Sequence, residues 1–137
     1  MKKSTPESSQ KQPVSREKLR ALFESAGHED GLRNILLDFY ARMARDVMIG
    51  FFFEGKNLAD IVDKQIGFLL RAAGLRESYS GKAPAAAHLE LPKILPGHFD
   101  RRLRILEETL SAHGLTPDAI ATWVAFESAF RDGIVRD

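Results

Sequence analysis

Apolar residues recur at spacings of three and four along most of this chain, which is the periodicity of amphipathic helices. The pattern predicts helices in the segments 16–27, 30–45, 57–74, 99–110 and 116–129, with a short alanine-rich helical piece around His88. No run alternates in the way expected of a strand, and no internal repeat is visible. The sequence therefore predicts an all-α fold.

Local signals predict where these helices begin and end. Asp30, Asn57 and Thr116 precede apolar stripes, and each has a side chain that can cap the exposed amides of a helix N-terminus. Glycine and proline interrupt the stripes because they disfavour a continuing helix. These interruptions fall at Gly27, Gly55, Gly74, Pro92, Pro96 and Gly97.

Length and composition indicate one globular domain. The chain has 137 residues, 44% of them hydrophobic and 28% charged. Residues 1–15 are polar and predict a disordered N-terminal tail, which leaves 16–137 as the folded domain. Twenty Lys and Arg against nineteen Asp and Glu give a net charge of +1, which argues against a dedicated nucleic-acid or membrane-surface binder.

The absence of cysteine excludes disulfides, thiolate metal sites and a cysteine nucleophile, and it suits a reducing cytoplasm. The longest apolar stretches, 48–53 and 119–126, are well below the about 20 residues that span a bilayer. No apolar segment follows the basic N-terminus, so no signal peptide is expected. We expect a cytoplasmic protein.

Three polar side chains, those of Tyr40, Gln65 and His88, occupy positions where the pattern calls for core residues. Burial of such groups costs free energy unless each finds a partner. Taken alone, each could be an ordinary core residue that binds no ligand. This explanation is weakest for Gln65, because its amide must satisfy two donors and an acceptor within an apolar stripe. A bare zinc or iron site is poorly supported, because no second ligand stands at suitable spacing. A haem needs only one protein imidazole, an apolar slot and hydrogen-bond donors on the opposite side, and this short list matches what is unusual in the sequence.

These residues belong to four short segments that resemble the landmarks of truncated haemoglobins, the shortened two-over-two helical globins. The segments are Asp-Phe-Tyr at 38–40, Phe-Phe-Glu-Gly at 52–55, Lys-Gln at 64–65 and Tyr-Ser-Gly at 79–81, followed by His88. Tyr40, Phe53, Gln65 and His88 are separated by 13, 12 and 23 residues, as in that family, without gaps. The similarity extends from about Leu19 to Val135.

The resemblance implies a two-over-two globin fold around haem b, with His88 as the protein ligand of the iron. It implies that Phe53 packs on the haem face, and that Tyr40 and Gln65 donate hydrogen bonds to a diatomic ligand on the opposite, distal side. The remaining positions that it assigns to the haem pocket are Ile61, Phe68, Leu69 and Tyr79, with Lys56, Tyr79 and Lys82 as candidate propionate contacts.

The sequence also departs from the family pattern. Gly27 and Gly74 each lack the neighbouring glycine that the family often has, and the segment between His88 and Phe99 is about one residue longer than expected. Arg102 stands near the place of a distal tryptophan in some subfamilies, and we expect it to face solvent. His98 is a rival iron ligand that we expect to be exposed.

The function implied by the resemblance is reversible binding of dioxygen, carbon monoxide, nitric oxide or a similar ligand. Two extensions stay open. One is nitric oxide dioxygenation, which yields nitrate and ferric haem and needs an unidentified reductase. The other is gas or redox sensing through a separate partner. A third alternative is a haem-free helical interaction domain in which Tyr40, Gln65 and His88 are ordinary core residues.

Overall fold

The computed structural model describes residues 14–76 and 92–136, and these residues form helices without any strand, as the periodicity predicts. The elements are α2 (Arg16–Ser25), α3 (His28–Arg45), the 3-10 helix η1 (Gly50–Phe53), α4 (Leu58–Ala72), α6 (Pro96–Ala112), α7 (Pro117–Ser128) and α8 (Arg131–Ile134). Residues 1–13 of the predicted tail and the whole segment around His88 lie outside the described residues.

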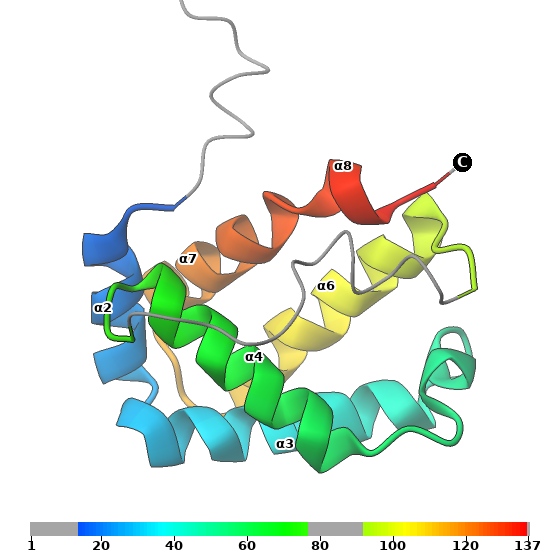
Figure 1. Ribbon diagram of the computed structural model, residues 1–137, viewed down its shortest axis with the longest axis horizontal. Helices are drawn as coiled ribbons and strands as arrows, with labels where there is room; N and C mark the ends of the chain where they lie inside the picture. Colours follow the sequence, from blue (N-terminus) through cyan, green and yellow to red (C-terminus); the bar gives the residue numbers. More distant parts are fainter. Residues whose placement is uncertain (1–13, 77–91, 137) are drawn as a thin grey trace, which may run out of the picture.

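The helices form two packed pairs, α3 with α4 and α6 with α7 (Figure 1). Helix α3 also packs against α6, and therefore joins the two pairs. Helix α2 closes one end of the molecule through contacts with α7, α3 and α4. The C-terminal residues return to the start of α6, where the Arg136 amide donates to the Ile94 carbonyl at 2.7 Å.

The apolar stripes predicted for the helices form the core. The most deeply buried side chains of α3 and α4 are those of Leu32, Phe39, Met43, Val62 and Ile66, and they pack with Leu106 and Leu110 of α6 and Trp123 of α7. None of the described helices has both the length and the apolar character needed to cross a membrane.

Two of the three predicted helix caps are confirmed. The Asn57 side chain accepts a hydrogen bond from the Asp60 amide at 3.1 Å, and the Thr116 hydroxyl accepts one from the Ala119 amide at 3.2 Å. The predicted Asp30 cap is wrong, because α3 already begins at His28 with Gly27 as its N-cap and no side-chain cap bond. Asp30 is instead an acidic residue of the first turn, where the helix dipole favours negative charge.

Helix α6 begins earlier than the apolar stripe suggests. Pro96, predicted to interrupt the chain, is the first residue of α6, where a missing amide hydrogen costs nothing. The short helix α8 was not predicted, because four residues are too few to show a periodicity.

The corner between α2 and α3 depends on two glycines that are four residues apart. Gly27 has φ +95°, a left-handed conformation that glycine adopts without steric cost. A side chain at Gly31 would collide with the Ala26 carbonyl, so the two helices could not approach as closely. The corner therefore forms without a glycine adjacent to Gly27.

Candidate functional site

Tyr40 and Phe53, two of the predicted site residues, lie against each other. Tyr40 is in α3 and only 2% exposed, and Phe53 is the half-buried last residue of η1. Their rings meet edge to face with centroids 5.8 Å apart, and the Phe39 ring also contacts that of Tyr40, with centroids 5.4 Å apart. The buried Tyr40 ring therefore packs against two phenylalanine rings.

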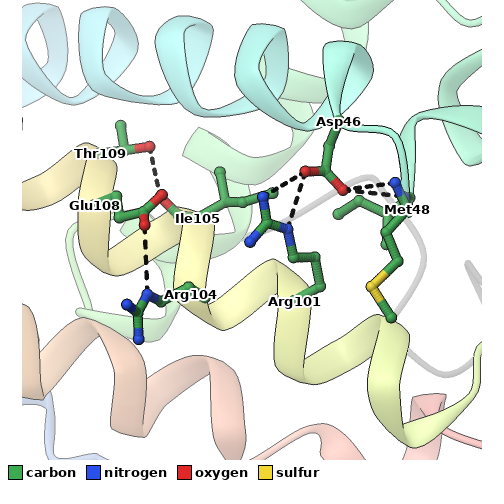
Figure 2. A network of polar contacts seen from close by, with 8 residues as sticks. Asp46, Met48, Arg101, Arg104, Ile105, Glu108 and Thr109 are labelled. Atoms are coloured by element: carbon green, nitrogen blue, oxygen red, sulfur yellow. Dashed lines mark hydrogen bonds and ion pairs between the residues drawn. The ribbon is translucent and has the colours of Figure 1, made fainter.

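The turn that presents Phe53 is held by Asp46, just after the end of α3 (Figure 2). One carboxylate oxygen accepts from the amides of Met48 and Ile49 at 3.0 and 3.1 Å. The other accepts from Nε and Nη2 of Arg101 in α6 at 2.9 and 2.7 Å. The Arg101 hydrogen bond is the main reason that the pKa of Asp46 lies below its usual value, and the two amides lower it further against the effect of burial. A buried carboxylate therefore ties the η1 turn to α6.

Helix α4 presents two parallel stripes that differ in burial. The residues of the first stripe, Val62, Ile66, Leu69 and Ala73, are buried in the core. The residues of the second, which we call the half-buried stripe, are Ile61, Gln65, Phe68 and Ala72. The spacing of four, three and four residues places the half-buried stripe on one helix face. The predicted pocket residues Ile61, Gln65 and Phe68 all belong to it, while Leu69 lies in the buried stripe beside it.

Gln65 is the polar member of the half-buried stripe. Its amide makes no hydrogen bond with any of the residues 14–76 and 92–136. Its neighbours on the stripe are apolar, so its amide donors are available to a group placed over this face. Phe68 extends the apolar surface toward α7 and α8, since its ring centroid lies 5.8 Å from that of Phe126 and 5.4 Å from that of Phe130.

The expectation that Arg102 faces solvent is wrong. Its side chain is 21% exposed and points from α6 between α3 and α7. Nε donates to Glu127 of α7 at 2.8 Å, and Nη2 donates to the Tyr40 hydroxyl at 3.4 Å. The guanidinium also lies 5.0 Å from the centroid of the Phe39 ring and 5.6 Å from that of Tyr40. A cation therefore stands beside the buried phenol.

Arg102 stays charged in this position. Burial works against the charged form, but the Glu127 carboxylate and the Tyr40 oxygen outweigh it, so the pKa of Arg102 lies above its usual value. Glu127 is itself only 10% exposed and was not singled out in the sequence. The signal was present, because Arg102 follows Phe99 by three residues and Glu127 follows Trp123 by four, which places both on core-facing sides of their helices.

The rival iron ligand His98 has a structural role. It lies in the first turn of α6, half-buried, and its Nδ1 accepts a hydrogen bond from the Leu95 amide at 3.0 Å. Its ring packs edge to face against Phe52, with centroids 5.2 Å apart. Lys56 is exposed, and His88, Tyr79 and Lys82 lie outside the described residues.

The arrangement of the described residues fits a flat apolar cofactor. A half-buried, mostly apolar helix face that carries one amide without a hydrogen bond to the described residues suits a group that is apolar over its plane and polar at one point. Among residues 14–76 and 92–136 no three His, Asp or Glu side chains gather in a way that could hold a bare metal ion.

The family model described as bacterial-like globin matches residues 21–132, which is most of the chain. A group 1 truncated hemoglobin of Chlamydomonas moewusii is 30% identical over 123 residues, which are 89% of this chain and 68% of that protein. The chain belongs to the bacterial-like globin family, as a truncated haemoglobin. A group 1 truncated hemoglobin of Mycolicibacterium paratuberculosis is 25% identical over 101 residues, or 74% of each chain.

Solved structures confirm the fold of this truncated haemoglobin. The Fe(III) form of the truncated hemoglobin from Tetrahymena pyriformis matches with a TM-score of 0.75 at 23% identity, over 85% of this chain and 98% of that one. The 2/2 hemoglobin from Synechococcus sp. PCC 7002, in the cyanomet state with covalently attached heme, matches with a TM-score of 0.72 at 23% identity, over 84% and 98% of the two chains. The predicted all-α two-over-two fold is thus confirmed, and membership of the family makes the chain a haem-binding globin.

Proposed function

We propose that this truncated haemoglobin binds haem b through His88 and reversibly holds dioxygen, or another small diatomic ligand, beside Tyr40 and Gln65. The observation that supports this most strongly is the buried Tyr40 hydroxyl together with a half-buried stripe on α4 whose polar member, Gln65, makes no hydrogen bond with residues 14–76 and 92–136.

When bound, haem supplies an iron centre at which a diatomic ligand can coordinate. The chain supplies the surroundings. Phe53, Ile61 and Phe68 offer apolar surface that excludes water from the cofactor plane, and a dry site strengthens any hydrogen bond made in it. The Gln65 amide and the Tyr40 hydroxyl are the groups able to donate to a ligand there.

These donors favour a ligand that accepts hydrogen bonds well. A haem held there would supply electron density to a bound ligand, and dioxygen would accept more of it than carbon monoxide and so would be the better hydrogen-bond acceptor. We therefore place dioxygen ahead of carbon monoxide as the ligand that Tyr40 and Gln65 retain. A hydrogen bond contributes about 1 to 3 kcal/mol where a charged or strongly polar partner is involved, enough to decide between two similar ligands.

The role of His88 is tested by adding haemin to the purified protein, reducing it and exposing it to carbon monoxide. We expect a globin-like Soret band that shifts with carbon monoxide, and its loss or alteration in His88→Ala. His98→Ala is the matched control and should keep the unmutated spectrum, because His98 caps α6. Failure of the unmutated protein to take up stoichiometric haem would contradict the proposal, and loss of the band in His98→Ala alone would move the ligand to His98.

The role of Tyr40 is tested by the dissociation rate of dioxygen. Tyr40→Phe removes the hydroxyl and keeps the ring that packs against Phe53. Loss of a hydrogen bond of about 1 to 3 kcal/mol should raise the rate by a factor of about five to one hundred or more. The rate is measured by stopped flow, displacing dioxygen with carbon monoxide. An unchanged rate would remove Tyr40 from the ligand site.

A further inference from the structure

Three side chains from three helices form a connected polar chain in the interior: Glu127 of α7, Arg102 of α6 and Tyr40 of α3. Glu127 is 10% exposed, Arg102 21% and Tyr40 2%, so these three side chains are largely shielded from water. An Arg–Glu pair in such a place is costly to desolvate, and apolar residues often stabilise a protein as well. Its presence therefore calls for a reason beyond stability.

The direction of the Arg102–Tyr40 hydrogen bond is unambiguous. A guanidinium has donors and no acceptor, so the Tyr40 oxygen accepts and its own proton is not used in this contact. A hydroxyl that accepts a hydrogen bond from a cation becomes a stronger donor, because the two bonds polarise each other in a low-dielectric interior. The chemistry of the Tyr40 hydroxyl thus depends on its neighbour.

The Arg102 guanidinium is held in place on several sides. Glu127 accepts a hydrogen bond from Nε, and the Phe39 ring packs against the guanidinium carbon. Nη1 points to the Met43 sulfur at 3.8 Å. Because Glu127 binds Nε, Nη2 remains directed at Tyr40. Glu127 orients the cation, and the cation acts on the phenol.

We propose that Arg102 is a positioning residue that strengthens Tyr40 as a hydrogen-bond donor and so raises the preference of the site for dioxygen over carbon monoxide. This inference rests on the proposed function, because it requires Tyr40 to face the ligand. Arg102 acts through Tyr40, and Glu127 serves to aim it.

The test compares two variants that remove the cation, one of which also removes its buried countercharge. Arg102→Met alone strands the Glu127 carboxylate, so the Arg102→Met/Glu127→Met double variant, which replaces the whole ion pair by apolar side chains, keeps the fold. In haem-loaded protein we expect both to release dioxygen about three- to tenfold faster, with little change for carbon monoxide. The C–O stretching frequency of the carbon monoxide complex should rise, since the donor facing the ligand is weaker. Arg104→Met makes the same chemical change at an exposed position of α6 and should behave as the unmutated protein.

Two further measurements separate action through Tyr40 from other roles. In a Tyr40→Phe background, the Arg102→Met/Glu127→Met change should have no further effect on dioxygen release, because the hydroxyl is already gone. In haem-free protein, the same substitutions should be coupled to Tyr40→Phe by about three- to tenfold in the unfolding equilibrium constant, which reports the contact without the cofactor.

The outcomes distinguish this inference from the proposed function. If the unmutated protein takes up no haem, both the proposed function and this inference are overturned. If it binds haem and Tyr40→Phe releases dioxygen faster, but the Arg102 variants match the unmutated protein in rate and C–O frequency, the inference alone is overturned. Equal rate increases with and without the Tyr40 hydroxyl would also overturn it, since Arg102 would then act on the ligand directly.

Discussion

Arg101 and Arg102 are consecutive residues of α6 with the same side chain, but they meet different environments. Arg101 is 39% exposed and forms a salt bridge with Asp46 just after α3, which holds the turn before η1 in place (Figure 2). Arg102, about 100° around the helix, is 21% exposed and reaches Glu127 and Tyr40 in the interior. Arg101 thus stabilises a turn, whereas Arg102 polarises a buried hydroxyl. The partner of each charged side chain and its exposure determine how much that side chain contributes to stability. We therefore expect effects of different size at the Asp46–Arg101 contact and at the Arg102–Glu127 pair.

The largest loss of stability is expected where a partner is removed from the interior pair. Glu127→Ala leaves Arg102 charged and unpaired in a place with little water, at a cost of about 3 kcal/mol. Urea unfolding of the haem-free protein measures it. The Arg102→Met/Glu127→Met double variant is the control and should recover most of the loss. A double variant as unstable as Glu127→Ala would show that the ion pair itself stabilises the fold.

The next largest effect is expected at Asp46. Asp46→Asn removes the negative charge that accepts from Arg101 and from the amides of Met48 and Ile49, at a cost of about 1 to 2 kcal/mol at neutral pH. Because the pKa of Asp46 is lowered in the folded state, its contribution is complete above the unfolded value of about 3.9 and is lost as the pH falls through the folded value.

The stability difference between the unmutated protein and Asp46→Asn should therefore shrink as the pH falls below about 4. Urea unfolding at a series of pH values checks this. Asp38 titrates over a similar range because its hydrogen bond to Arg42, and then that to His113, lower its pKa, but it is present in both proteins and cancels in the difference. A difference that stays constant down to pH 2 would show that Asp46 acts without its charge.

The smallest effects are expected at Arg101 and Arg104 of α6, whose side chains are 39% and 69% exposed. Arg101→Met should cost less than Asp46→Asn, since Asp46 keeps its two amide partners. Arg104→Met should cost about 0 to 0.5 kcal/mol, because Arg104 and Glu108 form an exposed pair within one helix. Thermal unfolding of the two variants side by side gives the order. A larger loss for Arg104→Met than for Arg101→Met would contradict the view that exposure and partner determine the contribution.

Much of the fold could be predicted because it depends on neighbours in the sequence. The apolar stripes of α3, α4 and α6 and the caps at Asn57 and Thr116 are interactions within about four residues, and they appear in the structure where the pattern places them. The errors are also local. Asp30 was predicted to be the N-cap of α3, but Gly27, three residues earlier, is the N-cap, and Pro96 is the first residue of α6 where an interruption was expected.

The candidate site divides in the same way. The spacing of Ile61, Gln65 and Phe68 predicts that they share a helix face, and the structure places them on one half-buried stripe. The spacing of Arg102 from Phe99 indicates a core-facing position, but it does not identify the partner that would make burial of the charge acceptable, because Glu127 lies 25 residues further along the chain. Only the meeting of α6 with α7 makes its burial acceptable.

The sequence by itself determined the helices, most of their ends and the family landmarks, since backbone propensity, capping and periodicity act over a few residues. Only the tertiary structure decided that Arg102 turns inward to Glu127 and Tyr40 while Arg101 turns to Asp46. The physical reason is that the free energy of a charge depends on the water and countercharges around it, and these come from helices distant in the chain.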